Sequence, residues 1–247
     1  MAVELLCKLD HRECEEALNK TGLALIRGVN PPTQNELLDF CKSFPSYSDK
    51  LLEWDFGPVM ELKVKADAKN YLFSKEKVPF HWDGAFHKEP AVLAFQCLYS
   101  DSGKGGETIF TNTTEVWRSL PPSLQEACRQ IELEFSTEKF AHYGGTFRKK
   151  LVQKHPLTGE TILRFAEPVE TKLNPVSRRI HGITCLDANE FVQELTNRIY
   201  DPQFCYAHKW QTGDILFADN FTLIHGRNAI QENVERWIRR LQILHKN

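Results

Sequence analysis

The 247-residue sequence predicts a mainly β fold, a sandwich or barrel with supporting helices. Short apolar segments bounded by turn residues recur through much of the chain, and each has the length of a strand. Helical patterns interrupt them too irregularly for the strand–helix alternation of a doubly wound parallel sheet. No repeat period, low-complexity tract or long block of charge divides the sequence. One domain over residues 1–247 is therefore the simplest organisation.

The N-terminal part predicts two helices around one buried strand. Residues 10–19 (DHRECEEALN) have helical character, and the apolar run at 22–29 lies between two glycines, which suits a buried strand. Residues 35–44 (NELLDFCKSF) form an amphipathic helical pattern with Thr33 or Asn35 available as its N-cap.

The strand-rich part begins near Met60. Its predicted strands are residues 61–64, 78–80, 92–99, 108–112, 162–165, 215–219 and 237–244. Helices are predicted at residues 114–120, 122–131 and 187–200, the last with apolar side chains at 191, 195 and 199 on one face. Residues 140–174 are polar and punctuated by Gly and Pro, so we expect a long insertion or lid between strands there.

Composition and charge exclude several classes of function. The 31 basic and 33 acidic residues give a net charge of −2, which provides no basic surface for nucleic acid or an anionic membrane. No apolar run approaches the ~18 residues that span a bilayer, and the first ten residues form no signal-peptide core. Seven cysteines without a C-x-x-C pair predict reduced thiols and a cytoplasmic setting. The expected partner is a small-molecule substrate, and the sequence leaves open whether the chain forms a homo-oligomer.

Three side chains can form a metal site. His81 and Asp83 lie in the segment FHWDGAF, and His225 lies in FTLIHGR. Residues i and i+2 of a strand share a face, so H-x-D presents an imidazole beside a carboxylate. A third ligand from a distant strand completes the 2-His-1-carboxylate triad typical of non-haem Fe(II). Because H-x-D alone is a weak signal, the alternative is a core His81, a turn at Asp83 and a loop histidine at 225.

Arg236 lies eleven residues after His225. Strand alternation places Arg236, Ile238 and Arg240 on one face, so an arginine can point inward. A buried guanidinium needs a partner, because an unpaired buried charge is costly. A dicarboxylate cosubstrate would supply that partner through bidentate hydrogen bonds, and a salt bridge to an internal Asp or Glu is the alternative.

Together these residues and their spacing resemble the taurine dioxygenase (TauD/TfdA) superfamily of Fe(II)/2-oxoglutarate-dependent oxygenases. The resemblance covers most of the chain and includes the segment GGET at 105–108 and the turn at 213–214. It implies a double-stranded β-helix (jelly roll) and a catalytic iron held by His81, Asp83 and His225. It also implies that Thr108 and Arg236 bind 2-oxoglutarate, with O2 as the other cosubstrate. The carboxylate at position 83 favours hydroxylation or desaturation, because halogenating relatives have a small residue there.

The segments FHWDGAF, LAFQC (93–97) and IRRLQIL (238–244) look closest to the isonitrile-biosynthesis branch of this superfamily. That resemblance implies a carboxylate-bearing, amino-acid-derived isonitrile, oxidised by hydroxylation or by desaturation with loss of CO2. Arg240, fifteen residues after His225, matches an anion-binding arginine of the family, whereas Lys77 replaces the asparagine that contacts sulfonate in the taurine enzyme. The candidate substrate contacts are Arg240, Lys77, His142, Arg164 and Phe86.

Two other classes of function remain open. A zinc- or manganese-dependent cupin-like hydrolase or isomerase could use the same three ligands, but it would have no use for Thr108 and Arg236. A non-catalytic, ligand-binding jelly roll would keep its ligand affinity when His225 is replaced by alanine.

Overall fold

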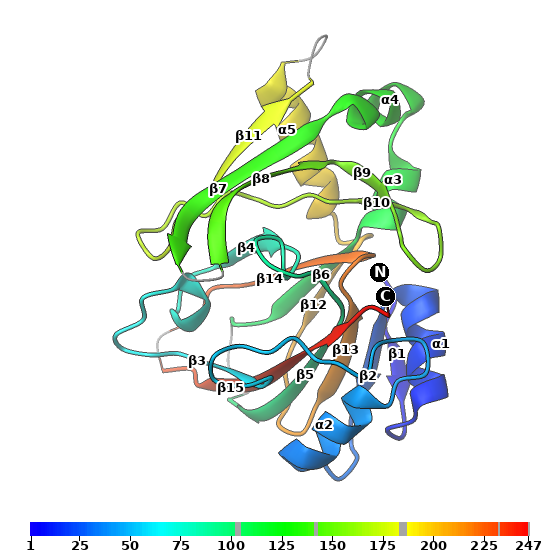
Figure 1. Ribbon diagram of the computed structural model, residues 1–247, viewed down its shortest axis with the longest axis vertical. Coiled ribbons are helices and arrows are strands. Elements are labelled where there is room, and N and C mark those ends of the chain that lie inside the picture. Colours follow the sequence, from blue (N-terminus) through cyan, green and yellow to red (C-terminus); the bar gives the residue numbers. More distant parts are fainter. Residues whose placement is uncertain (102–104, 141–142, 183–186, 232, 247) are drawn as a thin grey trace.

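Two β-sheets pack face to face in the centre of the molecule (Figure 1), and the computed structural model describes residues 1–101, 105–140, 143–182, 187–231 and 233–246. The larger sheet has the order β1 (Glu4–Leu6), β2 (Leu23–Ile26), β13 (Ile215–Asp219), β5 (Pro90–Ser100), β15 (Arg236–Leu244) and β3 (Met60–Lys63). The smaller sheet has the order β12 (Cys205–His208), β6 (Thr108–Asn112), β14 (Leu223–Arg227) and β4 (Val78–His81). The predicted mainly β architecture with supporting helices is confirmed.

Two helices cover the outer face of the larger sheet. Helix α1 (His11–Thr21) begins after Asp10, whose side chain accepts a hydrogen bond from the Glu13 amide. Helix α2 (Gln34–Lys42) begins with a capping box between Thr33 and Glu36, so Thr33 is the N-cap. Alternate residues of the sheet strands pack beneath these helices, including Ala94, Phe217 and Leu241.

The opposite face of the larger sheet faces the smaller sheet. Side chains such as Leu93 and Phe95 of β5 meet Phe110 of β6 and Leu223 of β14 in a buried cluster. Because successive side chains of a strand point to opposite faces, one set of strands builds both the helix-covered core and this inter-sheet core.

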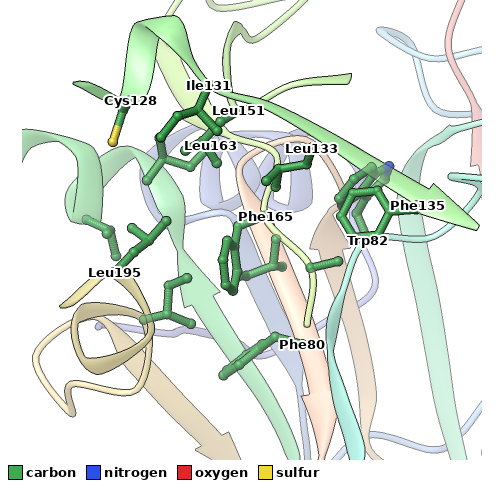
Figure 2. Close-up of a cluster of buried hydrophobic side chains, with 14 of the residues drawn as sticks. Phe80, Trp82, Cys128, Ile131, Leu133, Phe135, Leu151, Leu163, Phe165 and Leu195 are labelled. Carbon is green, nitrogen blue, oxygen red and sulfur yellow. The ribbon is translucent and has the colours of Figure 1, made fainter. Parts of the chain in front are cut away.

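A third layer covers the outer face of the smaller sheet (upper part of Figure 1). It contains a three-stranded sheet in the order β11 (Ser177–His181), β7 (Glu132–Phe140) and β8 (Tyr143–Lys150), and a pair formed by β9 (Val152–Lys154) and β10 (Thr161–Leu163). The helices α3 (Thr113–Ser119), α4 (Pro122–Gln130) and α5 (Ala188–Ile199) complete it. Figure 2 shows the apolar cluster beneath this layer, where Phe80 and Trp82 meet Phe135 and Phe165.

The expected insertion or lid at residues 140–174 contains three of these strands. β8 pairs antiparallel with β7, and β9 pairs with β10, so much of the insertion is a folded wall. Phe147 points inward from β8 and is half-buried, whereas Arg148 is exposed and binds Glu134 at 2.7 Å. One-sided burial makes such a segment look polar in sequence. None of the described helices is long and apolar enough to cross a membrane.

Candidate functional site

His81, Asp83 and His225 converge where the smaller sheet meets the larger one. His81 ends β4, Asp83 follows two residues later, and His225 lies in β14 directly opposite His81 in the antiparallel ladder. The Nε2 atom of each histidine is 3.6 Å from Oδ1 of Asp83, and one ligand atom from each of the three residues lies within 4.8 Å of the others. The strand pairing therefore assembles the three-ligand cluster expected from the sequence.

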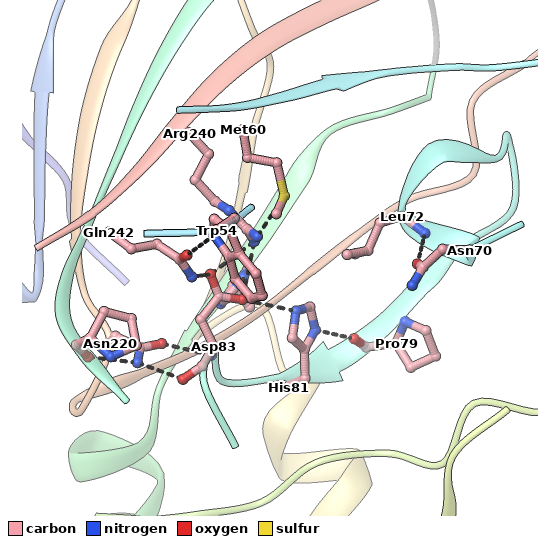
Figure 3. Close-up of polar contacts among 12 residues, drawn as sticks. Trp54, Met60, Asn70, Leu72, Pro79, His81, Asp83, Asn220, Arg240 and Gln242 are labelled. Atoms are coloured by element: carbon pink, nitrogen blue, oxygen red, sulfur yellow. Dashed lines mark hydrogen bonds and ion pairs between the residues drawn. The ribbon is translucent and has the colours of Figure 1, made fainter. Parts of the chain in front are cut away.

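Both imidazoles direct Nε2 toward this cluster. Nδ1 of His81 lies 2.9 Å from the Pro79 carbonyl oxygen (Figure 3), and because a carbonyl only accepts, Nδ1 carries the proton. His225 is buried between Phe95 and Phe110, and burial together with the nearby His81 lowers its pKa to about 3. Two imidazoles and one carboxylate are a donor set that fits Fe(II).

The backbone of Asp83 is fixed by one asparagine. Asn220 accepts a hydrogen bond from the Asp83 amide at 2.9 Å, and it donates to the carbonyls of Asp83 and Pro90 at 3.1 and 2.9 Å (Figure 3). Gly84 follows at φ +83°, and a Cβ there would lie 2.2 Å from the Lys88 carbonyl oxygen. The sharp turn that aims Asp83 inward thus requires glycine.

The Asp83 carboxylate is held from behind by β15. Arg240 Nη1 lies 2.8 Å from Oδ2 and donates to Oδ1 at 3.1 Å, and Gln242 Nε2 donates to Oδ2 at 2.6 Å. Trp54 Nε1 donates to Gln242 Oε1 at 3.2 Å, which turns the Gln242 amide so that its NH2 group faces Asp83 (Figure 3). Burial raises the pKa of Asp83, but Arg240 and the two histidines outweigh it and hold the pKa below its usual range. Oδ1 remains directed at the imidazoles.

A small cavity adjoins the cluster on one side. Its polar lining is cationic, with Thr108, Arg227, Arg236 and Arg240 beside the two histidines. Arg236 donates to the Gly106 carbonyl at 2.7 Å and to Thr108 Oγ1 at 3.3 Å, and burial lowers its pKa to about 9. No carboxylate of the described residues forms an ion pair with Arg236. The internal salt bridge considered from the sequence is therefore absent there, and this guanidinium can bind an anion.

Arg227 holds the segment that contains Leu72, Ser74 and Glu76 against the small cavity. Its guanidinium donates to the backbone carbonyls of Leu72, Ser74 and Glu76 at 2.9, 2.6 and 2.6 Å. Leu72, His81 and Arg240 line both this cavity and a second, larger one. The two cavities therefore meet at the histidine–aspartate cluster.

The large cavity has a volume of about 290 Å3 and mainly aromatic walls. Its aromatic lining residues are Trp54, Phe56, Tyr71, Phe73, Trp82, Phe86, Phe135, Tyr143 and Phe147. Phe86 packs edge-on against Phe147 with ring centroids 4.8 Å apart, and it lies 5.3 Å from Tyr143. The β7–β8 wall therefore contributes directly to the cavity that Phe86 was expected to line.

The other candidate substrate contacts lie in different places. Arg240 lines the cavity but is paired with Asp83. Lys77 is exposed, donates to the Tyr200 hydroxyl at 2.6 Å and does not line the cavity. Arg164 is buried away from it, where it donates to the Asn220 carbonyl at 2.6 Å and to Glu89 at 3.2 Å. His142 lies outside the described residues.

Sequence reasoning missed several residues that shape the site. Gln242 could have been found, because the strand alternation that selects Arg236 and Arg240 continues to position 242. Trp54, Asn220 and Glu167 reach the site from segments far away in the chain, and no local spacing connects them to His81 or Asp83. Their contribution becomes visible only through tertiary contacts.

Comparisons with known proteins agree with this geometry. The model of the taurine catabolism dioxygenase TauD, TfdA family matches residues 2–242. The chain is 40% identical to 3-((Z)-2-isocyanoethenyl)-1H-indole synthase of Fischerella ambigua, covering 99% of this chain and 87% of the relative. It is 32% identical to tyrosine isonitrile desaturase of Pseudomonas aeruginosa, covering 90% and 77%. The structure of PvcB, an Fe, alpha-ketoglutarate dependent oxygenase from an isonitrile synthetic pathway, matches with a TM-score of 0.78 at 26% identity, covering 100% and 84%.

Proposed function

The chain belongs to the taurine catabolism dioxygenase TauD, TfdA family, and we propose that it is an Fe(II)/2-oxoglutarate-dependent dioxygenase that oxidises an amino-acid-derived isonitrile. The reaction is a desaturation with loss of CO2 or a hydroxylation. The observation that carries this proposal is the meeting of a cationic cavity and an aromatic cavity at a buried cluster of two histidines and one aspartate.

In this proposal His81, Asp83 and His225 hold the iron. Bound Fe(II), with 2-oxoglutarate as co-reductant, supplies the activation of O2 that the cleavage of an unactivated C–H bond requires. Burial lowers the pKa of His225, and Arg240 and the two histidines lower that of Asp83, so these two ligands are in the form that binds a metal, since protonated ligands would not bind it. Gln242 holds Oδ2 of Asp83, Arg240 contacts both oxygens, and Oδ1 also lies 3.6 Å from Nε2 of each histidine.

Arg236 and Thr108 bind the distal carboxylate of 2-oxoglutarate. Both side chains are buried and lie next to each other in the small cavity, and Arg236 has no internal carboxylate partner among the described residues. A bound anion compensates the cost of burying this guanidinium. The protein thereby orients the cosubstrate toward the metal ligands.

The large cavity binds the substrate. Its aromatic walls bury a flat ring, and the positive charge of Arg240 provides a partner for a substrate carboxylate. The indole and tyrosine isonitrile enzymes among the relatives favour a substrate that carries an aromatic ring. Within the single domain that we propose for residues 1–247, the two facing sheets support the double-stranded β-helix expected from the family resemblance.

Product analysis tests this proposal. Purified protein with Fe(II), 2-oxoglutarate and O2 is offered the isonitriles of tryptophan and tyrosine, and products and succinate are measured by mass spectrometry. We expect one succinate for each isonitrile oxidised, and neither product with His225→Ala. Isonitrile conversion without 2-oxoglutarate would instead indicate a hydrolase or isomerase. Unchanged ligand binding in His225→Ala, without any turnover in the wild type, would indicate a non-catalytic jelly roll.

A further inference from the structure

We propose that Glu167 recognises a hydrogen-bond donor on the aromatic ring of the substrate, such as an indole N–H or a phenol O–H. This inference rests on the proposed function and narrows its substrate class. It starts from a half-buried carboxylate in a cavity whose walls are otherwise mainly aromatic and aliphatic.

The position of Glu167 is fixed by β4. The Glu167 amide donates to the Phe80 carbonyl at 2.9 Å, and the Phe80 amide donates back to Oε2 of Glu167 at 2.9 Å. Phe80 directly precedes His81, one of the proposed iron ligands. Glu167 is therefore tied to the strand that carries the metal site, and it lines the same cavity as His81 and Asp83.

Oxygen Oε2 of Glu167 is fully engaged. Besides the Phe80 amide, it accepts a hydrogen bond from the Tyr200 hydroxyl at 2.5 Å, and Lys77 donates to that hydroxyl at 2.6 Å. Burial and the hydrogen bond to Glu167 raise the pKa of Tyr200, so the phenol keeps its proton and donates it to Oε2. Lys77 and Tyr200 thus position Glu167, and neither of them is a lining residue of the cavity.

The second oxygen, Oε1, has no hydrogen-bond donor among the described residues. Because Glu167 lines a mainly apolar cavity, a donor that a ligand brings to this carboxylate stabilises the complex, and a ligand without one is penalised. The cavity's acidic lining residues in the described part of the chain are Asp83 and Glu167, and both oxygens of Asp83 face protein groups. Of these two carboxylates, Glu167 is the one with an oxygen left for a substrate.

The cavity therefore complements three features of one ligand. Arg240, which is also paired with Asp83, is the cationic lining residue, the aromatic walls offer a flat apolar surface, and Glu167 offers an acceptor. An isonitrile derived from tryptophan or tyrosine has a carboxylate and an aromatic ring with one hydrogen-bond donor. Because the isonitrile nitrogen carries no hydrogen, that ring donor is the one N–H or O–H donor of the ionised molecule. The corresponding isonitrile of phenylalanine lacks the donor.

The test compares two ligands of nearly equal shape. The isonitrile of tryptophan carries an indole N–H, and the isonitrile of 3-benzothienylalanine has sulfur in that place. We expect the wild type to prefer the indole compound by about 10- to 100-fold, in kcat/KM and in the Kd measured by calorimetry, as a hydrogen bond to a charged acceptor predicts.

Glu167→Gln is the decisive variant. Its amide oxygen can keep the Phe80 and Tyr200 hydrogen bonds, which leaves the NH2 group facing the cavity, where it opposes a ring N–H. We expect the preference for indole to vanish or invert, with an unchanged Tm and unchanged affinity for Co(II) titrated alone. Glu138→Gln, at an exposed acid that lines neither cavity, is the matched control and should keep the wild-type preference.

A second variant keeps the inference testable if Glu167→Gln does not fold. Tyr200→Phe removes one donor from Oε2 and should reduce the preference several-fold while leaving Co(II) affinity unchanged. Equal use of both compounds by the wild type would overturn the inference. So would a Glu167→Gln variant that keeps the wild-type preference for indole. If only Tyr200→Phe folds, the same preference in that variant would overturn it. Tighter binding of tryptophan than of its isonitrile would also overturn it, because Glu167 would then recognise an ammonium. If no succinate forms with either compound, the proposed function fails, and the calorimetric comparison still decides the role of Glu167.

Discussion

The two cavities that meet at His81 and Arg240 are built in different ways. The polar groups of the small cavity come from hydrogen-bonded strands, with Thr108 on β6, His225 on β14 and Arg236 on β15. The large cavity is walled largely by connecting segments and by the β7–β8 pair. Ladder register fixes the first set of side chains precisely, whereas the second set can vary without disturbing the sheets. In the proposed function, this difference separates the metal and cosubstrate groups, held by the sheets, from the residues that contact the substrate.

The largest effect is expected at the cluster between the cavities. Replacing His225 with alanine removes one of three metal ligands, so metal affinity should fall by at least about 100-fold and succinate formation should cease. Anaerobic calorimetric titration with Fe(II) measures the affinity, and circular dichroism checks the fold. His87→Ala is the matched control, because His87 is exposed at the large cavity and lies outside the cluster. Equal metal affinity in the two variants would refute the assignment.

A smaller effect is expected in the small cavity. Arg236→Leu should raise the KM for 2-oxoglutarate by about 10- to 100-fold, because charge-assisted hydrogen bonds to the distal carboxylate are lost. Affinity for Fe(II) and the Kd for the isonitrile should not change. Arg239→Leu is the control, since Arg239 is the half-buried residue next to Ile238 and donates to Gln96 instead. An unchanged KM in Arg236→Leu would transfer the cosubstrate role to Arg240, the other β15 arginine that lines this cavity.

The support behind Asp83 should matter less than the ligands themselves. Gln242→Leu removes the 2.6 Å hydrogen bond to Oδ2, and metal affinity should fall about 10-fold, at the lower end of the range for partners of metal ligands. Trp54→Phe removes only the group that orients Gln242 and should give a weaker loss in the same titration. Wild-type affinity in Gln242→Leu would show that Arg240 and Asn220 position Asp83 without it.

The smallest catalytic effect is expected in the large cavity. Phe147→Ala should raise the KM for an aromatic isonitrile several-fold and leave the KM for 2-oxoglutarate unchanged, because Phe147 lines the large cavity and not the small one. Because the side chain is half-buried, the free energy of unfolding should fall by about 1–3 kcal/mol, less than for truncation of a fully buried phenylalanine. Kinetics and urea unfolding measure the two effects. A matching change in the KM for 2-oxoglutarate would show that the cavities are not independent.

The same difference explains how much could be predicted from the sequence. The cluster follows from local rules, because H-x-D on a strand and the alternation at Arg236, Ile238 and Arg240 each reveal a shared face. Within residues 132–181 a strand was predicted only at 162–165 and a sheet-forming layer was not, because strands such as β8 half-bury one face and expose basic residues on the other. Lys77 and Glu167 are linked by hydrogen bonds through Tyr200, the C-cap of α5, which is far from both in the sequence. Sequence spacing could therefore not relate them.

The central claim is that His81, Asp83 and His225 hold Fe(II) next to a 2-oxoglutarate site formed by Arg236 and Thr108. Its most direct test is an anaerobic titration of the Fe(II)-loaded protein with 2-oxoglutarate, followed by visible absorption. We expect a metal-to-ligand charge-transfer band that saturates in the wild type, needs more 2-oxoglutarate in Arg236→Leu and is absent in His225→Ala. A wild-type protein that binds Fe(II) and 2-oxoglutarate without this band, or a His225→Ala protein that retains it, would contradict the account.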